Sequence, residues 1–129
     1  MIIKSKRLPG EIWREVYGIY ALSNKGRWYS SYTKKIVKQH KNSSGYYRAC
    51  LYIDGKRKWV FTHINVVLLF GDCKGQTIPE EMKSLLKNGY SIDHKDGKKK
   101  HNDVDNLELV THQENCIRRS RKICKTQTI

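Results

Sequence analysis

The sequence predicts an α+β fold, with a strand-rich N-terminal module followed by a compact ββα unit. Three observations support this prediction. Residues 11–61 combine aromatic and β-branched side chains with short turn signals, which is typical of strands. Residues 62–89 change to apolar blocks bounded by helix start and stop signals. Residues 89–119 then follow the pattern of a strand, a polar loop, a second strand and a helix.

Short strands and tight turns are expected in the first half. The stretch "EIWREVYGIYALSNKGRWYSS" is rich in strand formers and has a turn signal at Asn24-Lys25-Gly26. The stretch "GYYRACLYIDGKRKWVFT" predicts a hairpin, because Asp54-Gly55 suits a turn that needs positive φ. Alternation along "YRACLYI" is only approximate, so the buried face of this hairpin stays open.

Two helices are expected between the halves. "THINVVLLFG" predicts a helix over 62–71, with Thr62 as its cap and the final glycine as its stop. "TIPEEMKSLLKNG" predicts another over 77–89. There Pro79 fits the first turn, and the two glutamates after it favour the positive helix N-terminus.

The last unit contains "GYSIDH" and "LELVT" as short strands and a helix that starts within "THQENCIRRSR". Thr111 and Glu114 have the spacing of a capping box, which fixes the helix start. This start places Asn115 in the first or second turn. The end of the first strand, at Asp93 and His94, can then lie over the start of the helix.

Asp93 and Asn115 would offer two oxygen ligands at that junction, a set that suits Mg²⁺ because this ion keeps much of its water shell. His94 would face the other way, since successive strand side chains diverge. A neutral imidazole there could take a proton from water. Asp, Asn and Gly are also ordinary turn formers, so a plain solvated loop is the alternative, and the residues alone leave the two open.

Charge is the strongest compositional signal. Lys and Arg number 26 against 12 Asp and Glu, for a net charge of +14, which indicates a polyanionic partner. Basic and aromatic residues alternate through the first half, so we expect a sheet that lies on DNA; a merely solvated basic face is the alternative. The residues expected to contact DNA phosphates are Arg27, Arg48, Lys56, Arg57, Lys58, Lys98, Lys99, Lys100, Arg118 and Arg119.

Other compartments and sites are not favoured. No apolar run approaches the ~20 residues of a spanning helix, and "MIIKSKRLPG" has no apolar signal core, so no membrane association and an intracellular location are expected. The four cysteines are far apart and form no C-x-x-C pair, so free thiols are expected rather than a zinc site or a disulfide.

The segment "DHKDGKKKHNDVDNLELVTHQEN" resembles the HNH endonucleases, members of the His-Me finger or ββα-metal group. The signature positions fall at His94, Asn106 and Asn115, spaced by 12 and then 9 residues. "EIWREVYGIYALSNKGRWYSS" is similar to the NUMOD-type module that precedes HNH domains in phage and intron-encoded homing endonucleases. The resemblance covers roughly residues 11–119. It implies a NUMOD-like DNA-binding module over 1–60, an HNH nuclease domain over 61–120 and a basic tail over 121–129.

By position, the resemblance implies His94 as general base, Asp93 and Asn115 as metal ligands, and Asn106 as the residue that ties the loop and keeps His94 oriented. The implied cofactor is Mg²⁺, with Mn²⁺ as a substitute. The implied substrate is double-stranded DNA, cut to 5′-phosphate and 3′-hydroxyl ends in the cytoplasm of a phage-infected bacterium, without an obligate protein partner. An Asp directly before the catalytic His resembles the nicking members.

Further positions carry weaker expectations. His63 is expected to pack or to face DNA, and His101 and His112 are expected to be exposed. No helix-turn-helix module, with which several homing endonucleases continue, is recognisable up to residue 129, so recognition of a long site is not predicted. A DNA-binding protein that keeps the fold without cleavage is the rival function; the intact Asp93, His94 and Asn115 weigh against it.

Overall fold

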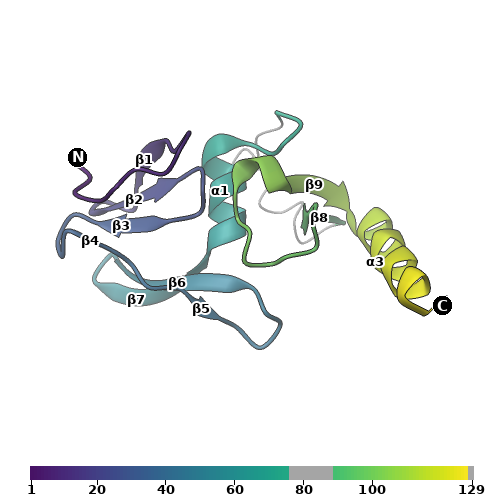
Figure 1. The fold of residues 1–129 in the computed structure, drawn as a ribbon. Coiled ribbons are helices and arrows are strands. Elements are labelled where there is room, and N and C mark those ends of the chain that lie inside the picture. The colour runs from purple at the N-terminus through teal and green to yellow at the C-terminus, as the bar shows by residue number, and fades with distance from the viewer. Residues whose placement is uncertain (76–88, 128–129) are drawn as a thin grey trace.

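The structure, a computed structural model, describes residues 1–75 and 89–127. The N- and C-termini lie at opposite ends of an elongated molecule, with helix α1 between the N-terminal strands and the last strands (Figure 1). The first antiparallel sheet has the strand order β1 (Trp13–Val16), β2 (Tyr20–Ser23), β3 (Trp28–Ser30), β4 (Lys35–Ile36). The second has the order β5 (His40–Lys41), β6 (Tyr47–Ile53), β7 (Lys56–Phe61).

The two turns that the sequence predicts in this half are confirmed. Asn24-Lys25-Gly26 joins β2 to β3, and Gly26 has a φ of 82°. Asp54 and Gly55 join β6 to β7 with φ values of 54° and 75°, the pair of positive values that a type I′ turn needs. On β6 the side chains of Ala49 and Leu51 are fully buried, which settles the face that the sequence left open.

Helix α1 (Thr62–Phe70) confirms the predicted helix but corrects its cap. Its N-cap is Phe61, with no side-chain hydrogen bond. Thr62 is the first helical residue and is fully buried. Its hydroxyl accepts a hydrogen bond from Trp28 Nε1 at 2.9 Å and donates to Gln39. Gly71 ends the helix at a φ of 85°, and its N–H donates to the carbonyl of Val67.

The ββα unit is present as predicted. It consists of β8 (Tyr90–His94), the 3₁₀ turn η2 (Val104–Asn106), β9 (Leu107–Thr111) and α3 (His112–Gln127), and β8 pairs with β9 in an antiparallel arrangement. The Thr111 hydroxyl accepts from the Glu114 N–H at 3.1 Å, but the Glu114 carboxylate contacts Arg118 at 2.9 Å instead of closing the capping box. Most of the helix predicted over 77–89 lies outside the described residues.

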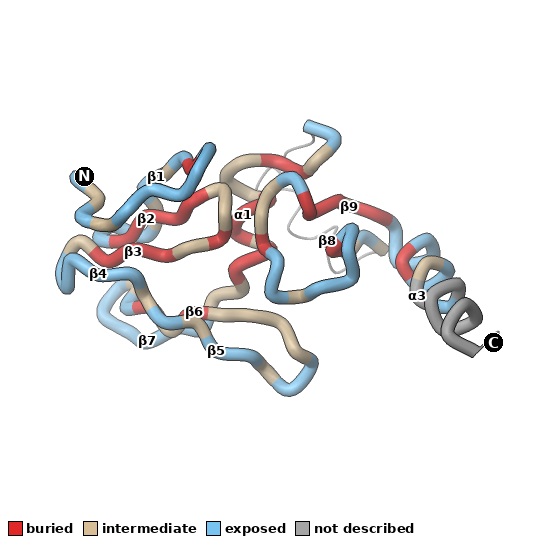
Figure 2. Tube along the Cα trace, viewed as in Figure 1, coloured by how far each residue is buried: buried red, intermediate tan, exposed pale blue. Residues whose placement is uncertain are grey.

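A single hydrophobic cluster joins the two predicted parts of the chain. Trp28 and Leu51 from the N-terminal sheets pack with Val67 of α1 and with Ile92 and Leu107 of the last two strands. Figure 2 shows the buried segments running from β2 and β3 through α1 to β9. The N-terminal sheets and the ββα unit therefore share one core across the predicted boundary at residue 60.

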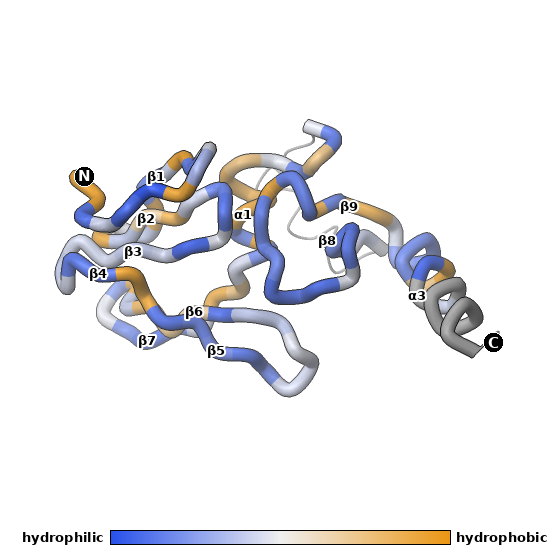
Figure 3. The backbone as a smooth tube through the Cα atoms, in the orientation of Figure 1, coloured by the Kyte–Doolittle hydropathy of each residue, from blue (hydrophilic) through white to orange (hydrophobic). Residues whose placement is uncertain are grey.

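Polar sequence dominates the outer segments. The β6–β7 hairpin tip, the loop between β8 and β9 and the start of α3 are strongly hydrophilic, whereas α1 is apolar (Figure 3). No helix among the described residues is long and apolar enough to cross a membrane. Cys50, Cys73 and Cys116 are free thiols, as expected; the side chain of Cys124 is outside the described part.

Candidate active site

The end of β8 sends its last two side chains to opposite faces. Asp93 points with Ser91 toward α3, where Asp93 contacts Arg118 and Ser91 contacts Asn115. His94 points to the other face, where its ring contacts Asn102. This divergence is the one expected of neighbouring strand residues.

One cavity nevertheless brings the predicted residues together. Asp93, His94 and Asn115 all line a hollow of about 200 Å³, which Tyr46 and Lys99 also line. His94 and Asn115 are only 4% and 8% exposed, so both side chains are almost completely buried at the wall of this cavity. The candidate base and both candidate oxygen donors therefore border the same cavity.

A buried hydrogen bond fixes the state of His94. Its Nε2 lies 2.7 Å from Oδ1 of Asn102, and an amide oxygen can only accept, so Nε2 carries the proton. Nδ1 is then the nitrogen free to take a proton. Burial lowers the pKa of His94, and the contact with Asn102 opposes this shift only in part. The ring is therefore neutral near pH 7, as a general base must be.

Asn106 supports the loop between β8 and β9, and its side-chain hydrogen bonds among the described residues go to Asp96 and His101. Its Nδ2 donates to Oδ1 of Asp96 and to the carbonyl of His101, both at 2.9 Å, and its Oδ1 accepts from the Asp96 N–H at 3.2 Å. The hydrogen bond to the His94 ring comes from Asn102. Asn106 ties the loop, and its expected effect on the orientation of His94 stays a prediction.

The two oxygen donors are each held by a neighbour. Oδ2 of Asp93 accepts from Arg118 at 2.9 Å, which leaves Oδ1 without a hydrogen bond among the described residues. Asn115 donates its Nδ2 to Ser91 Oγ at 3.1 Å, which fixes its amide with Oδ1 as the remaining acceptor. A carboxylate and an amide oxygen on one cavity fit a hard divalent cation such as Mg²⁺. No cluster of three or more His, Cys, Asp or Glu that could hold a metal occurs in the described residues.

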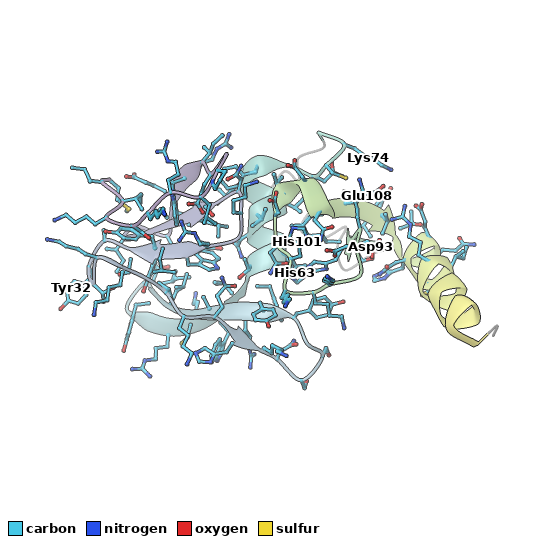
Figure 4. The ribbon with its side chains drawn as sticks, viewed as in Figure 1. Tyr32, His63, Lys74, Asp93, His101 and Glu108 are labelled. Carbon is cyan, nitrogen blue, oxygen red and sulfur yellow. The ribbon has the colours of Figure 1, made fainter. Side chains whose placement is uncertain are left out.

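His63 lies next to His94 and packs against aromatic rings, which is one of the two roles expected for it. Its ring stacks on Tyr46 with centroids 4.9 Å apart and lies 5.4 Å from the ring of His94. Figure 4 shows His63 closer to α1 and Asp93 closer to α3. Burial, and then the neighbouring His94, lower the pKa of His63 to about 3.

The predicted phosphate contacts divide into two groups. Lys98 and Lys100 are exposed on the loop after β8, and Lys56, Arg57 and Lys58 are exposed on β7. Two arginines on one face of β6 and β7 make cation–π contacts: Arg48 lies 4.3 Å from the centroid of the Trp59 ring, and Arg57 lies 5.3 Å from that of Tyr52. Lys99 donates to the carbonyl of Ser44 at 2.7 Å beside the cavity.

Two guanidiniums are engaged differently from the sequence prediction. Arg27 is paired with the buried carboxylate of Glu11 and donates to the carbonyl of Lys6. Arg118 contacts three carboxylates and keeps part of its side chain exposed. Both guanidiniums thus have structural partners in this fold, and their contact with phosphate stays a prediction. The side chain of Arg119 is not among those described.

The remaining histidines are exposed, as expected for His101 and His112. His101 lies 2.7 Å from Asp96 through Nδ1, on the outer side of the loop. His40 lies against the edge of Trp59, with centroids 5.8 Å apart. None of these three lines the cavity that holds His94.

Sequence reasoning missed Asn102, Ser91 and Tyr46. Asn102 lies in a run of polar residues that looks like a solvated loop, and only its 4% exposure distinguishes it. Ser91 precedes the motif by two residues, so the alternation that groups it with Asp93 was the available signal. Tyr46 comes from the N-terminal half, and no local pattern links it to the site.

The chain is similar to known nucleases. Residues 77–116 match the family model described as HNH endonuclease. The DNA endonuclease I-HmuI of Bacillus phage SP01 is 33% identical over 106 residues, which span 80% of this chain and 54% of the relative. The H-N-H endonuclease F-TflII of Escherichia phage T5 is 29% identical over 102 residues, spanning 79% of this chain and 48% of the relative. This chain thus spans about half the length of these relatives.

A solved structure is also similar. It is titled "DNA binding and cleavage by the HNH homing endonuclease I-HmuI", and it matches with a TM-score of 0.69 and 32% identity over 86% of this chain and 59% of that chain. The family model starts at residue 77, so the NUMOD-type resemblance of the N-terminal half stays a prediction. The chain therefore carries an HNH endonuclease segment at residues 77–116 and has the fold of an HNH homing endonuclease.

Proposed function

We propose that this chain is a metal-dependent DNA endonuclease of the HNH homing type, which hydrolyses phosphodiester bonds. The observation that supports this most is the meeting of Asp93, His94 and Asn115 on one cavity, with His94 neutral and its Nδ1 free. The phage endonucleases that the chain resembles support the same reaction. We also place its action on phage or host DNA in the bacterial cytoplasm.

The residues at the cavity have two different roles, proton transfer and metal binding. His94 accepts a proton from the attacking water at Nδ1, while Asn102 keeps the other ring nitrogen protonated. Oδ1 of Asp93 and Oδ1 of Asn115 would hold Mg²⁺, or Mn²⁺ in its place. When bound, the cation stabilises negative charge on the phosphate and on the leaving oxygen. The products carry 5′-phosphate and 3′-hydroxyl ends.

Substrate binding falls to the basic surface beside the cavity. Lys99 lines the cavity itself, and Lys98 and Lys100 flank it on the exposed loop. The outer face of β6 and β7 adds cations supported by aromatic rings, which suits the backbone of double-stranded DNA. With one His94 per chain, each catalytic event cuts one strand.

Substitution of the base tests the reaction. His94→Ala should lower plasmid cleavage by roughly 10²- to 10⁴-fold, the usual contribution of a general base. DNA affinity, measured by mobility shift, should stay near that of the wild type, because His94 is only 4% exposed and adds little to the surface that binds DNA. The matched control is His40→Ala, an exposed histidine away from the cavity.

The same assay distinguishes the nuclease from the rival function, a DNA-binding protein without catalysis. A DNA-binding protein without catalysis would bind plasmid and leave it supercoiled at every Mg²⁺ or Mn²⁺ concentration. Equal cleavage by wild type and His94→Ala would instead show that another group acts as the base.

A further inference from the structure

The turn between β2 and β3 lies directly against the loop that precedes η2 (Figure 1). The carbonyl of Asn24 accepts from the Val104 N–H at 2.8 Å, and Lys25 forms an ion pair with Asp103 at 2.8 Å. These contacts connect residues about 80 positions apart in the sequence. They fix the two residues that directly follow Asn102 in the chain.

Gly26 lies so close to Asn102 that its position has no room for a side chain. A Cβ placed on Gly26 would lie 2.8 Å from both the Cβ and the backbone oxygen of Asn102, a separation that real Cβ atoms do not adopt. The carbonyl of Gly26 in turn accepts from Gln39 Nε2 at 2.7 Å. Gln39 thus holds the turn through the Gly26 carbonyl. The space between Gly26 and Asn102 accepts a hydrogen atom but no larger side chain.

The buried side chain of Asn102 forms a hydrogen bond with the ring of His94. It is 4% exposed, and its Oδ1 accepts from His94 Nε2 at 2.7 Å. That bond decides which ring nitrogen of His94 carries the proton and how the ring faces the cavity. A displacement of Asn102 by 1 Å would therefore be transmitted to the imidazole.

We propose that Asn102 is the positioning residue of His94, and that the β2–β3 turn of the N-terminal region holds Asn102 in place. The N-terminal region then has two roles: its second sheet carries part of the basic surface, and the β2–β3 turn of its first sheet supports Asn102 beside the active site. The role in catalysis rests on the proposed function, whereas the positioning of the ring can be measured without DNA or metal.

The tautomer of His94 gives that direct measurement. In ¹⁵N-labelled protein, two-bond ¹H–¹⁵N correlations should show wild-type His94 as a single neutral tautomer protonated at Nε2. Asn102→Ala should lose this single state and mix tautomers. Asn102→Asp keeps an acceptor oxygen at the same place and should restore protonation at Nε2. An unchanged Nε2–H tautomer in Asn102→Ala would overturn the proposal.

The turn is tested with a matched pair of glycines. Gly26 and Gly18 have nearly equal φ values of 82° and 83°, so alanine strains the backbone alike at both. Nothing lies within 4 Å of a Cβ on Gly18, whereas a Cβ on Gly26 meets Asn102. Gly26→Ala should therefore disturb the His94 tautomer and lower kcat by up to roughly 10²-fold at unchanged KM for DNA. Gly18→Ala should do neither.

Two further readouts keep the test decisive. If Gly26→Ala unfolds, Lys25→Met removes the ion pair to Asp103 from the same turn and should broaden or shift the His94 signals. Identical His94 spectra for all folded turn variants would overturn the role of the turn. A wild type that never cleaves DNA would overturn the proposed function, and the tautomer would still decide whether Asn102 positions His94.

Discussion

His63 is a neutral imidazole enclosed by the fold. It is 8% exposed, and its Nδ1 is buried without a hydrogen-bond partner among the residues that the structure describes. Its pKa is lowered from 6.5 to about 3, first by burial. The unfolded chain therefore binds a proton as pH falls below about 6.5, and the folded chain does not until about pH 3. The stability linked to His63 is present above pH 6.5 and is lost as pH decreases toward 3.

This linkage predicts a measurable slope. Between pH 6.5 and 5 the wild type should lose roughly 2 kcal/mol of unfolding free energy through His63, at about 1.4 kcal/mol per pH unit. His63→Phe keeps the stacking on Tyr46 and should remove that part of the loss. Urea unfolding at pH 7 and pH 5 measures it, with the exposed His40→Gln as control. Equal pH slopes for His63→Phe and wild type would contradict the burial of a neutral ring.

The site residues show what the sequence can predict at this scale. The opposite directions of the Asp93 and His94 side chains are predictable, because neighbouring residues of a strand point to opposite faces. Asn115 is predictable because a cap at Thr111 fixes the helix start. Asn102 is not predictable in the same way, because its role depends on the contact of Gly26 from a distant turn.

Elements with strong local signals were predicted well. The β6–β7 hairpin follows from Asp54-Gly55, since few other pairs accept two positive φ values. The start of α1 was predicted with the wrong cap, because the Thr62 hydroxyl serves Trp28 and Gln39 rather than its own helix. The hydroxyl of Thr62 has these partners because α1 packs on the first sheet. Such a contact between distant segments cannot be predicted from the residues around Thr62 alone.

Arg118 fixes α3 on the β8–β9 pair. Asp93 and Glu108 are directly opposite in the strand register, where two carboxylates repel each other. Arg118 Nη1 contacts both, at 2.9 and 3.3 Å, and its Nη2 contacts Glu114 at 2.9 Å. Hydrogen bonds to Glu108 and then to Asp93 raise the pKa of Arg118 further above its ordinary value. The guanidinium therefore separates the charges and holds Asp93 at the cavity.

Removal of Arg118 should affect metal binding and catalysis in opposite directions. Arg118→Met takes away a positive charge next to Asp93, so Mn²⁺ binding without DNA should tighten by roughly threefold to tenfold. Cleavage at saturating metal should fall, because Asp93 loses its support. Paramagnetic resonance of free Mn²⁺ and plasmid nicking give the two values. Glu114→Gln, which leaves the Arg118–Asp93 contact intact, is the control. A lower DNA affinity with unchanged Mn²⁺ affinity would indicate a phosphate contact instead.

The whole molecule combines a net charge of +14 with one shared core. A protein that makes 6–10 phosphate contacts should lose roughly 10³- to 10⁵-fold in DNA affinity between about 50 and 200 mM salt. The slope of log affinity against log salt should decrease by roughly 0.9 for each contact removed. Replacement of Lys56, Arg57 and Lys58 by Gln should therefore flatten the slope.

Arg27 provides the matched control for this surface. Its guanidinium is engaged with Glu11, so Arg27→Gln should reduce stability and leave the salt slope unchanged. Salt-independent DNA binding by the wild type would contradict the electrostatic reading of the charge. Composition predicts that such a surface exists, but only the fold determines which cations remain open, because ion pairs such as Arg27–Glu11 depend on tertiary contacts.

The most direct test of the account is the nicking of supercoiled plasmid across a Mg²⁺ titration, with wild type, Asp93→Ala and Asn115→Ala. EDTA should stop the wild type, and added Mg²⁺ should restore it. Asp93→Ala should be the more impaired variant, because a carboxylate attracts a hard cation more strongly than a neutral amide oxygen does. Excess Mn²⁺ should partly rescue Asn115→Ala. Cleavage that persists in EDTA, or an Asp93→Ala protein as active as wild type at low Mg²⁺, would contradict a metal-dependent site at the end of β8.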